Sequence, residues 1–246
     1  MNHPPLPLNA WLRYDLTDRV LRKLPGVTSV LEVGAGEGGF GARLASRYRY
    51  VGVEPDVRSH ARARDRLREL GCGTIVCGDT SALEPGQTFD LVCGFEVLEH
   101  MPDEGAVLRE WRERVRPGGW LLLTVPAHEH RFGAHDRIVG HYRRYDPDRL
   151  AWLLRETGYE NPIVLAYGFP LGYLLETARN AIGRIAGSNG SMEEQTAASG
   201  RWLQPPEGIG WLTRGLSAPF RRLQRPFARS GLGTGLLVVA RRPACV

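Results

Sequence analysis

The sequence is poor in lysine, cysteine and long apolar runs, and each shortage excludes a class of protein. Lys23 is the only lysine among 32 basic residues, so the lysine runs common in nucleic-acid-binding arms are missing. The four cysteines form no CxxC pair and have no histidine at zinc-finger spacing, which argues against a zinc site and fits a reducing compartment. The longest uncharged apolar stretch, Ile163–Leu175, is too short to span a bilayer.

The composition that remains is typical of a folded protein, with 42% hydrophobic and 24% charged residues. Met1–Leu12 lacks the basic and apolar regions of a signal peptide, so we expect a cytoplasmic location. The net charge of +5 is unevenly placed: residues 201–246 carry +7, and residues 1–200 carry −2. A near-neutral body is therefore followed by a strongly basic segment.

Strand-like and helix-like segments alternate through the first two thirds of the chain. This alternation predicts an α/β fold with a doubly wound, mostly parallel sheet and helices on both faces. The expected helices are Asn9–Leu24, a helix ending near Tyr48, Val57–Leu70, Glu104–Val115 and Asp148–Thr157. The expected strands are Thr28–Val33, Tyr50–Glu54, Gly73–Cys77, Phe89–Cys93, Trp120–Val125 and Pro162–Tyr167.

The last third begins with an apolar helical stretch, Pro170–Ile185, and a Gly/Ser-rich linker, Gly187–Gly200. The basic segment follows, and Gly233–Arg241 reads as a final strand that pairs antiparallel with the previous one. We divide the chain into an N-terminal helix (1–27), a nucleotide-binding core (28–168), a helical lid or insert (169–232) and a last core strand with its tail (233–246). An insert of this length in a compact domain is typical of a lid or a disordered loop.

The most informative motif follows the first strand. Gly34, Gly36 and Gly39 satisfy G-x-G-x-x-G, whose glycines let the backbone turn sharply and approach a ligand closely. The pattern alone fits a dinucleotide site equally well. Glu32, two residues before the first glycine, is the discriminating residue, because a carboxylate beside a pyrophosphate is unfavourable whereas one beside a cationic cofactor is not.

Two more acids end the next two strands. Glu54 ends the second strand, where a carboxylate accepts hydrogen bonds from ribose hydroxyls, and Pro55 follows it. Asp79 ends the third strand beside Thr80, where it could accept a hydrogen bond from an adenine amino group. Each acid alone is more often a helix cap, but acids at successive strand ends favour a nucleoside site.

These elements together resemble the class I S-adenosylmethionine-dependent methyltransferases. The matching elements, in order, are Glu32–Gly38, Glu54, Gly78-Asp79, the Glu96-Val97-Leu98-Glu99-His100 stretch and the Arg116–Gly119 turn. The resemblance covers residues 28–160 and implies the seven-stranded methyltransferase fold, with an antiparallel last strand and S-adenosyl-L-methionine as cofactor. It further implies that Gly34 and Gly36 line the methionine part, Glu54 the ribose, Asp79 the adenine, and Phe95 or Glu96 the methyl-transfer face.

The loop after the fifth strand, Pro126–Tyr145, holds the candidate catalytic residues. It leaves the carboxyl end of a central strand, where ligands bind in open sheets. A histidine here could take a proton from the acceptor, and Arg143-Arg144 could hold a carboxylate or phosphate. The candidate bases are His128, His135 and His141, with His128 first because it is nearest the strand end. The alternative is that these side chains only tie the loop down.

The same loop resembles that of a subgroup of bacterial small-molecule methyltransferases, which are similar to the type 11 methyltransferases. Ubiquinone-type O-methyltransferases have a similar E-V-L-E-H stretch, for which a divalent ion has been proposed. Glu96 with Glu99 or His100 could face one ion at helical spacing, or could brace the helix instead. We expect no metal.

The basic segment has an apolar stripe opposite a row of arginines. The stripe consists of Leu212, Leu216, Phe220, Leu223 and Phe227. Residues 211–229 are therefore expected either to contact a membrane surface or lipidic acceptor, or to form a cap whose arginines lie in water. Pro219 and Pro226 predict two short helices rather than one.

The interpretation we favour is a methyltransferase acting on a small molecule, most plausibly at oxygen, in the biosynthesis of a secondary metabolite, lipid or quinone. An N- or C-methyltransferase and a non-catalytic nucleotide-cofactor-binding protein are the alternatives. A dehydrogenase is disfavoured by Glu32 and Asp79. A nucleic-acid substrate is disfavoured because no RNA-binding module accompanies the basic residues. The sequence does not indicate an oligomeric state.

Overall fold

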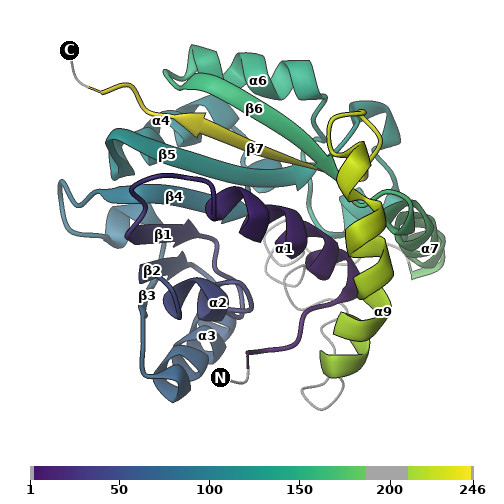
Figure 1. Ribbon diagram of the computed structural model, residues 1–246, viewed down its shortest axis with the longest axis horizontal. Helices are drawn as coiled ribbons and strands as arrows, with labels where there is room; N and C mark the ends of the chain where they lie inside the picture. The colour runs from purple at the N-terminus through teal and green to yellow at the C-terminus, as the bar shows by residue number, and fades with distance from the viewer. Residues whose placement is uncertain (1–2, 187–209, 245–246) are drawn as a thin grey trace.

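Seven strands form one sheet in the computed structural model, which describes residues 3–186 and 210–244 (Figure 1). The strand order is β3-β2-β1-β4-β5-β7-β6. The strands are β1 (Ser29–Val33), β2 (Arg49–Glu54), β3 (Thr74–Cys77), β4 (Phe89–Phe95), β5 (Val115–Pro126), β6 (Glu160–Tyr167) and β7 (Gly235–Arg241). The helices are α1 (Leu8–Leu21), α2 (Gly41–Ala45), α3 (Val57–Leu70), α4 (Glu104–Arg114), α5 (Ala134–Ile138), α6 (Pro147–Glu156), α7 (Leu171–Ala186) and α9 (Gly210–Leu223).

The sheet is parallel from β3 to β5 and antiparallel at its other end. β7 lies between β5 and β6 and runs antiparallel to both, with Leu122 and Ile163 opposite Val239. The predicted doubly wound, mostly parallel sheet with an antiparallel last strand is therefore confirmed. The strand order reverses at β1 and β4, and ligands bind beside the carboxyl ends of strands at such a reversal.

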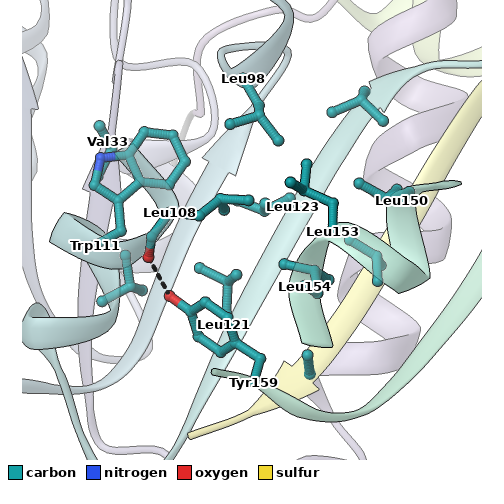
Figure 2. Packing of buried hydrophobic residues seen from close by; sticks show 14 of the residues in the cluster. Val33, Leu98, Leu108, Trp111, Leu121, Leu123, Leu150, Leu153, Leu154 and Tyr159 are labelled. Carbon is teal, nitrogen blue, oxygen red and sulfur yellow. Dashed lines mark hydrogen bonds between the residues drawn. The ribbon is translucent and has the colours of Figure 1, made fainter. Parts of the chain in front are cut away.

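Alternate residues of the strands enter two separate cores, one on each face of the sheet. On β5, Leu121 and Leu123 pack with α4 and α6, whereas Leu122 packs with α1 and α2 on the other face. Figure 2 shows the first of these cores, where Trp111 lies beside Val33 and Leu108, and Tyr159 lies near Leu154 of α6. The Tyr159 hydroxyl donates to the Leu108 carbonyl at 3.2 Å. Burial on both faces explains why these strands are almost continuously apolar in sequence.

The basic segment differs from its prediction in one respect. α9 runs unbroken through Pro219, and only Pro226 lies in a separate short turn, a 3₁₀ helix at Arg225–Phe227. The expectation that both prolines end helices is wrong for Pro219. α9 lies beside α1 in Figure 1 and buries Ser217, and these tertiary contacts offset the hydrogen bond that the proline removes.

The leucine stripe of α9 does not form its main packing face. Leu212, Leu216 and Leu223 are 40%, 55% and 48% exposed. Phe220 packs against the α1 side of the core. The predicted linker Gly187–Gly200 lies outside the described residues.

The structure differs from the sequence prediction at one helix boundary and in one additional helix. The helix after the glycine-rich turn is only α2, which ends at Ala45 rather than near Tyr48. The loop 126–145 contains the short helix α5, which packs against α7. Within the described part of the chain, no helix combines the length and the apolar character needed to cross a membrane.

Candidate active site

A cavity of about 1210 Å³ opens beside the carboxyl ends of β1, β2 and β4. Its walls come from α1, the loop after β1, α5 and α7. The predicted site residues that line it are Glu32, Gly34, Gly36, Glu54, Pro55, Asp79, Phe95, Glu96, His135 and His141. Thr80 and His128 do not line it.

The glycine-rich loop forms the floor of one half of the cavity, which we call the β1–β2 half. Gly34 has a φ of +68°, and a Cβ there would lie 2.6 Å from a methyl group of Val97, so only glycine fits. Gly36 has a φ of +55°, and among the described residues, its two chain neighbours aside, no atom lies within 4 Å of the place where a Cβ would sit. This open side permits close approach of a ligand to the backbone.

Glu54 ties the glycine-rich loop to the end of β2. One of its oxygens accepts a hydrogen bond from the Gly36 N–H at 2.7 Å, and the other accepts from the Asp56 N–H at 2.9 Å. The carboxyl group is buried, and burial raises its pKa. Because each carboxylate oxygen can accept two hydrogen bonds, Glu54 keeps capacity for ligand hydroxyls.

Asp79 has a capping role as well as a place on the cavity wall. Its Oδ1 accepts from the Ser81 N–H at 2.8 Å and from the Ser81 hydroxyl at 2.6 Å, and these bonds lower the pKa of Asp79. The neighbouring Thr80 is buried and its hydroxyl bonds to Glu110 of α4 instead of facing the cavity.

Three carboxyl groups lie near the junction of β1 and β4. Glu32 accepts a hydrogen bond from the Tyr50 hydroxyl at 2.6 Å, and its burial raises its pKa to about 8. Glu96 has a φ of +60°, a strained conformation for a residue other than glycine, and accepts from the Tyr167 hydroxyl at 2.8 Å. Glu99 is completely buried, and burial together with Glu96 raises its pKa well above the ordinary value.

Arg13 of α1 was not among the predicted site residues. Its Nη1 lies 3.4 Å from a carboxylate oxygen of Glu96, and its guanidinium stacks over the Phe40 ring. Against the effect of burial, Arg13 and Tyr167 hold the pKa of Glu96 below its ordinary value. The same helix also carries Asp15, Asp18 and Arg19, so no local sequence signal distinguished Arg13.

The opposite half of the cavity, which we call the α5–α7 half, contains a buried aspartate–histidine pair. The Nδ1 atom of His141 lies 2.8 Å from Asp136 Oδ1. Despite its burial, hydrogen bonds from His141 and Arg144 hold the pKa of Asp136 well below its ordinary range. An ionised carboxylate only accepts hydrogen bonds, so Nδ1 carries the proton and Nε2 of a neutral His141 is left as the basic nitrogen.

The other histidines have different surroundings. Burial and the neighbouring Arg179 lower the pKa of His135 to about 4, so its ring is neutral at physiological pH. Burial and His141 lower the pKa of His100 to about 4 as well. His128, at a φ of +65°, directs Nε2 to the Gly231 carbonyl at 3.0 Å and Nδ1 to within 3.6 Å of Asp146.

Arg143 and Arg144 tie the loop to the protein. Arg144 donates to both oxygens of Asp136 at 2.8 Å and to Glu176 at 2.6 Å. Arg143 donates to the carbonyls of Met101 and Pro102. Both arginines thus tie the loop down, which is the alternative that the sequence left open for these side chains.

Two groups of side chains have the spacing of metal ligands. One nitrogen or oxygen atom from each of Glu99, His100 and His141 lies within 4.8 Å of the others, as in the group formed by His128, His130 and Asp146. Both carboxyl oxygens of Glu99 are buried without a hydrogen-bond partner among the described residues. The first group therefore has the donor set for a divalent cation. Our expectation that the protein binds no metal stays a prediction.

Comparison with known proteins agrees with this arrangement. The sequence model described as "Methyltransferase domain" matches residues 8–162. An uncharacterized methyltransferase of Mycobacterium sp. (strain JLS) is 34% identical over 130 residues, which are 52% of this chain and 50% of that protein. The ubiquinone biosynthesis O-methyltransferase of Thiobacillus denitrificans is 30% identical over 183 residues, covering 62% of this chain and 78% of that protein. The chain thus spans about half the length of the first of these relatives.

A solved structure shares the fold. The phosphoethanolamine N-methyltransferase 2 of Haemonchus contortus, in complex with S-adenosyl-L-methionine, superposes with a TM-score of 0.59 at 15% identity, covering 94% of this chain and 52% of that one. Because the family model covers more than half of the sequence, the chain belongs to the methyltransferase-domain family, whose cofactor is S-adenosylmethionine.

Proposed function

We propose that this protein transfers a methyl group from S-adenosylmethionine to a hydroxyl oxygen of a small molecule. The observation that carries the proposal is the Asp136–His141 pair in the same cavity as the glycine-rich loop and Glu54. The cavity of about 1210 Å³ exceeds the roughly 300–1,000 Å³ of typical ligand sites, which leaves room for an acceptor beside the cofactor.

The β1–β2 half of the cavity suits the cofactor. Glu54 would accept hydrogen bonds from the ribose hydroxyls, and Arg13 would hold the methionine carboxylate. Gly36 leaves room for close approach of the backbone. Glu96 provides negative charge toward a cationic ligand, and Glu32 provides it once the ligand favours its ionised form. When bound, the cofactor supplies an activated methyl group, so the protein's main task is to position the acceptor.

His141 would act as the general base. Its Nε2 accepts the hydroxyl proton of the acceptor as that oxygen becomes an ether, and Asp136 stabilises the imidazolium that forms. Asp136 also fixes the tautomer, because its ionised carboxylate accepts from Nδ1. The O-methyltransferase named above supports oxygen as the target, whereas the N-methyltransferase shares only the fold.

A second candidate mechanism uses a divalent cation on the same wall. The unpartnered oxygens of Glu99 beside His100 and His141 favour it. A cation there would lower the pKa of an acceptor hydroxyl directly. Turnover measured after exhaustive chelation separates the two mechanisms: full activity supports the base, and loss restored by Mg²⁺ or Zn²⁺ supports the cation.

The test of the proposed function is a set of histidine variants. Purified protein is incubated with S-adenosylmethionine and a panel of phenols, aliphatic alcohols and amines, and methylated products are detected by mass spectrometry. His141→Gln should lower turnover of a hydroxyl acceptor by about 100-fold or more, with the affinity for S-adenosylhomocysteine unchanged. His60→Gln is the matched control, since His60 lies on α3, outside the cavity lining and outside both groups with metal-ligand spacing.

Two outcomes would contradict the proposal. One is a fully active His141→Gln protein, and the other is a protein that methylates only the amines of the panel. His128→Gln, tested in parallel, decides whether the histidine that ranks first by sequence position contributes.

A further inference from the structure

Three arginines, Arg131, Arg144 and Arg179, accompany two carboxylates in and behind the wall of the α5–α7 half of the cavity. Its two carboxylates, Asp136 and Glu176, are both fully paired. Arg144 donates to both of them, and Arg131 donates to Glu176 at 2.7 Å. The positive charges of these two arginines are therefore balanced within the wall.

Arg179 of α7, the third of these arginines, lines the cavity, and its Nε is buried without a hydrogen-bond partner among the described residues. Among the residues that the structure describes, no carboxylate lies within ion-pair distance of Arg179. Glu96 and Glu176 raise the pKa of Arg179 from a greater distance. Glu96 is already paired with Arg13, however, and Glu176 is paired with Arg131 and Arg144.

Burial and the charge of Arg179 both affect pKa values on this wall. Burial lowers the pKa of Arg179 itself, because desolvation disfavours the cation. The pKa of the adjacent His135 is also lowered, first by burial and then by Arg179. A buried, unpaired cation is costly, and an anionic ligand that enters the cavity would remove that cost.

We propose that Arg179 binds a carboxylate on the acceptor, which is then a small hydroxy acid with an apolar body. The inference rests on the proposed O-methyl transfer and adds the substrate class. A guanidinium donates two parallel hydrogen bonds to a carboxylate, which gives orientation as well as affinity. Leu175, Ile182 and Val139 line the cavity near it and suit an apolar ring or chain.

The methionine carboxylate of the cofactor is the competing partner for Arg179. Arg13 is better placed for that group, because it comes from α1 beside Phe40, which follows the glycine-rich loop. Arg179 comes from α7, the helix packed against α5, which carries Asp136 and His135. The two arginines therefore belong to different walls of the cavity, and binding experiments can separate their ligands.

The experiment compares an acid with its isosteric amide. Binding of 4-hydroxybenzoate and 4-hydroxybenzamide to the full chain saturated with S-adenosylhomocysteine is measured by calorimetry. The acid should bind about 10- to 100-fold more tightly than the amide. Arg179→Met should abolish this preference, whereas Arg179→Lys should retain part of it. Arg184→Met, on an exposed part of the same helix, should leave it unchanged.

A second measurement guards against misfolding. The thermal midpoint of cofactor-free Arg179→Met should equal or exceed that of the wild type, because the substitution removes an unpaired buried charge. The acid should raise the midpoint of the wild type more than the amide does, and this difference should vanish in Arg179→Met.

Three results would overturn the inference. The first is equal binding, or no binding, of acid and amide by the wild type. The second is a preference for the acid that survives in Arg179→Met. The third is a loss of S-adenosylhomocysteine affinity in Arg179→Met with an unchanged acid preference, which would assign the cofactor carboxylate to Arg179.

The same reagents keep the two proposals apart. Tight, Arg179-dependent binding of the acid without methylation of any hydroxyl acceptor contradicts the proposed O-methyl transfer and leaves the carboxylate site standing. Methylation of acid and amide with equal kcat/KM supports the transfer and contradicts the carboxylate site.

Discussion

Asp136 and His141 form the most closely defined pair in the cavity, with Asp136 Oδ1 and His141 Nδ1 2.8 Å apart and Arg144 donating to both oxygens of the aspartate. The pair orients the imidazole and keeps the aspartate ionised. Its geometry leads to the first of four predictions.

Asp136→Asn should lower kcat by about 100-fold or more without weakening cofactor binding. The amide can donate to Nδ1, which places the proton on Nε2 and removes the basic nitrogen from the cavity. Steady-state kinetics with a hydroxyl acceptor, and calorimetry with S-adenosylhomocysteine, provide the two readouts. A variant with wild-type kcat would show that His141 needs no fixed tautomer.

Glu54→Gln should weaken S-adenosylhomocysteine binding by about 10- to 100-fold, because a neutral amide replaces a carboxylate that accepts several hydrogen bonds. The size and shape of the side chain are preserved, but the amide has one accepting oxygen and therefore keeps only one of the two N–H partners, Gly36 or Asp56. Glu69→Gln, at an exposed position of α3, is the control and should bind normally. Equal affinity in both variants would remove Glu54 from the cofactor site.

Cofactor binding should release up to one proton near pH 7. Burial raises the pKa of Glu32 to about 8, so this carboxyl group is protonated in the cofactor-free protein. A cationic ligand nearby favours the ionised form, and the complex therefore binds fewer protons than the free protein. Affinity should then increase as pH rises toward about 8.

Calorimetry in two buffers of different ionisation enthalpy measures this proton count. Glu32→Gln should reduce it to about zero, because the amide does not titrate. A wild type that binds the cofactor with no proton exchange would show that Glu32 does not sense the ligand charge.

Asp90→Asn should destabilise the protein by about 2 kcal/mol, since a buried carboxylate loses charge-assisted hydrogen bonds. Asp90 Oδ2 accepts from the N–H groups of Thr28 and Ser29 at 2.8 Å, and Oδ1 pairs with Arg116 at 2.6 Å. Although its partial burial acts in the opposite direction, the hydrogen bonds from Thr28 and Ser29 lower its pKa to about 2.

The pH dependence of this effect has a definite sign. A carboxyl group with a lowered folded pKa stabilises the protein above its ordinary pKa of 3.8, and this stabilisation is lost as the pH falls through about 2. The difference in urea midpoint between wild type and Asp90→Asn should therefore shrink in acid. A constant difference from pH 7 to pH 2 would contradict this account, and exposed Glu160→Gln serves as the control.

The fold, and the residues that line the β1–β2 half of the cavity, could be predicted because their signals are local. Alternating apolar segments define the strands, and acids at the ends of β1 and β2 follow directly from those boundaries. The glycines at positions 34 and 36 require positive φ angles that the motif already indicated.

The arrangement of the α5–α7 half could not be predicted in the same way, because long-range packing determines it. His128 is nearest the strand end in sequence, yet its backbone conformation directs the ring to Gly231, far along the chain. Arg13 and Arg179 come from helices that precede and follow the core, and no local pattern relates them to Glu96. The persistence of α9 through Pro219 likewise depends on contacts with α1.

The position of β7 also constrains the order in which the protein can be assembled during synthesis. β6 pairs with no other strand among the described residues, so it cannot join the sheet until residues 235–241 have left the ribosome. β6 ends at Tyr167, whose hydroxyl bonds to Glu96. A nascent chain could thus form the glycine-rich loop and its neighbouring strands early, whereas the part of the cavity wall that includes Tyr167 would be completed only when the last strand is inserted.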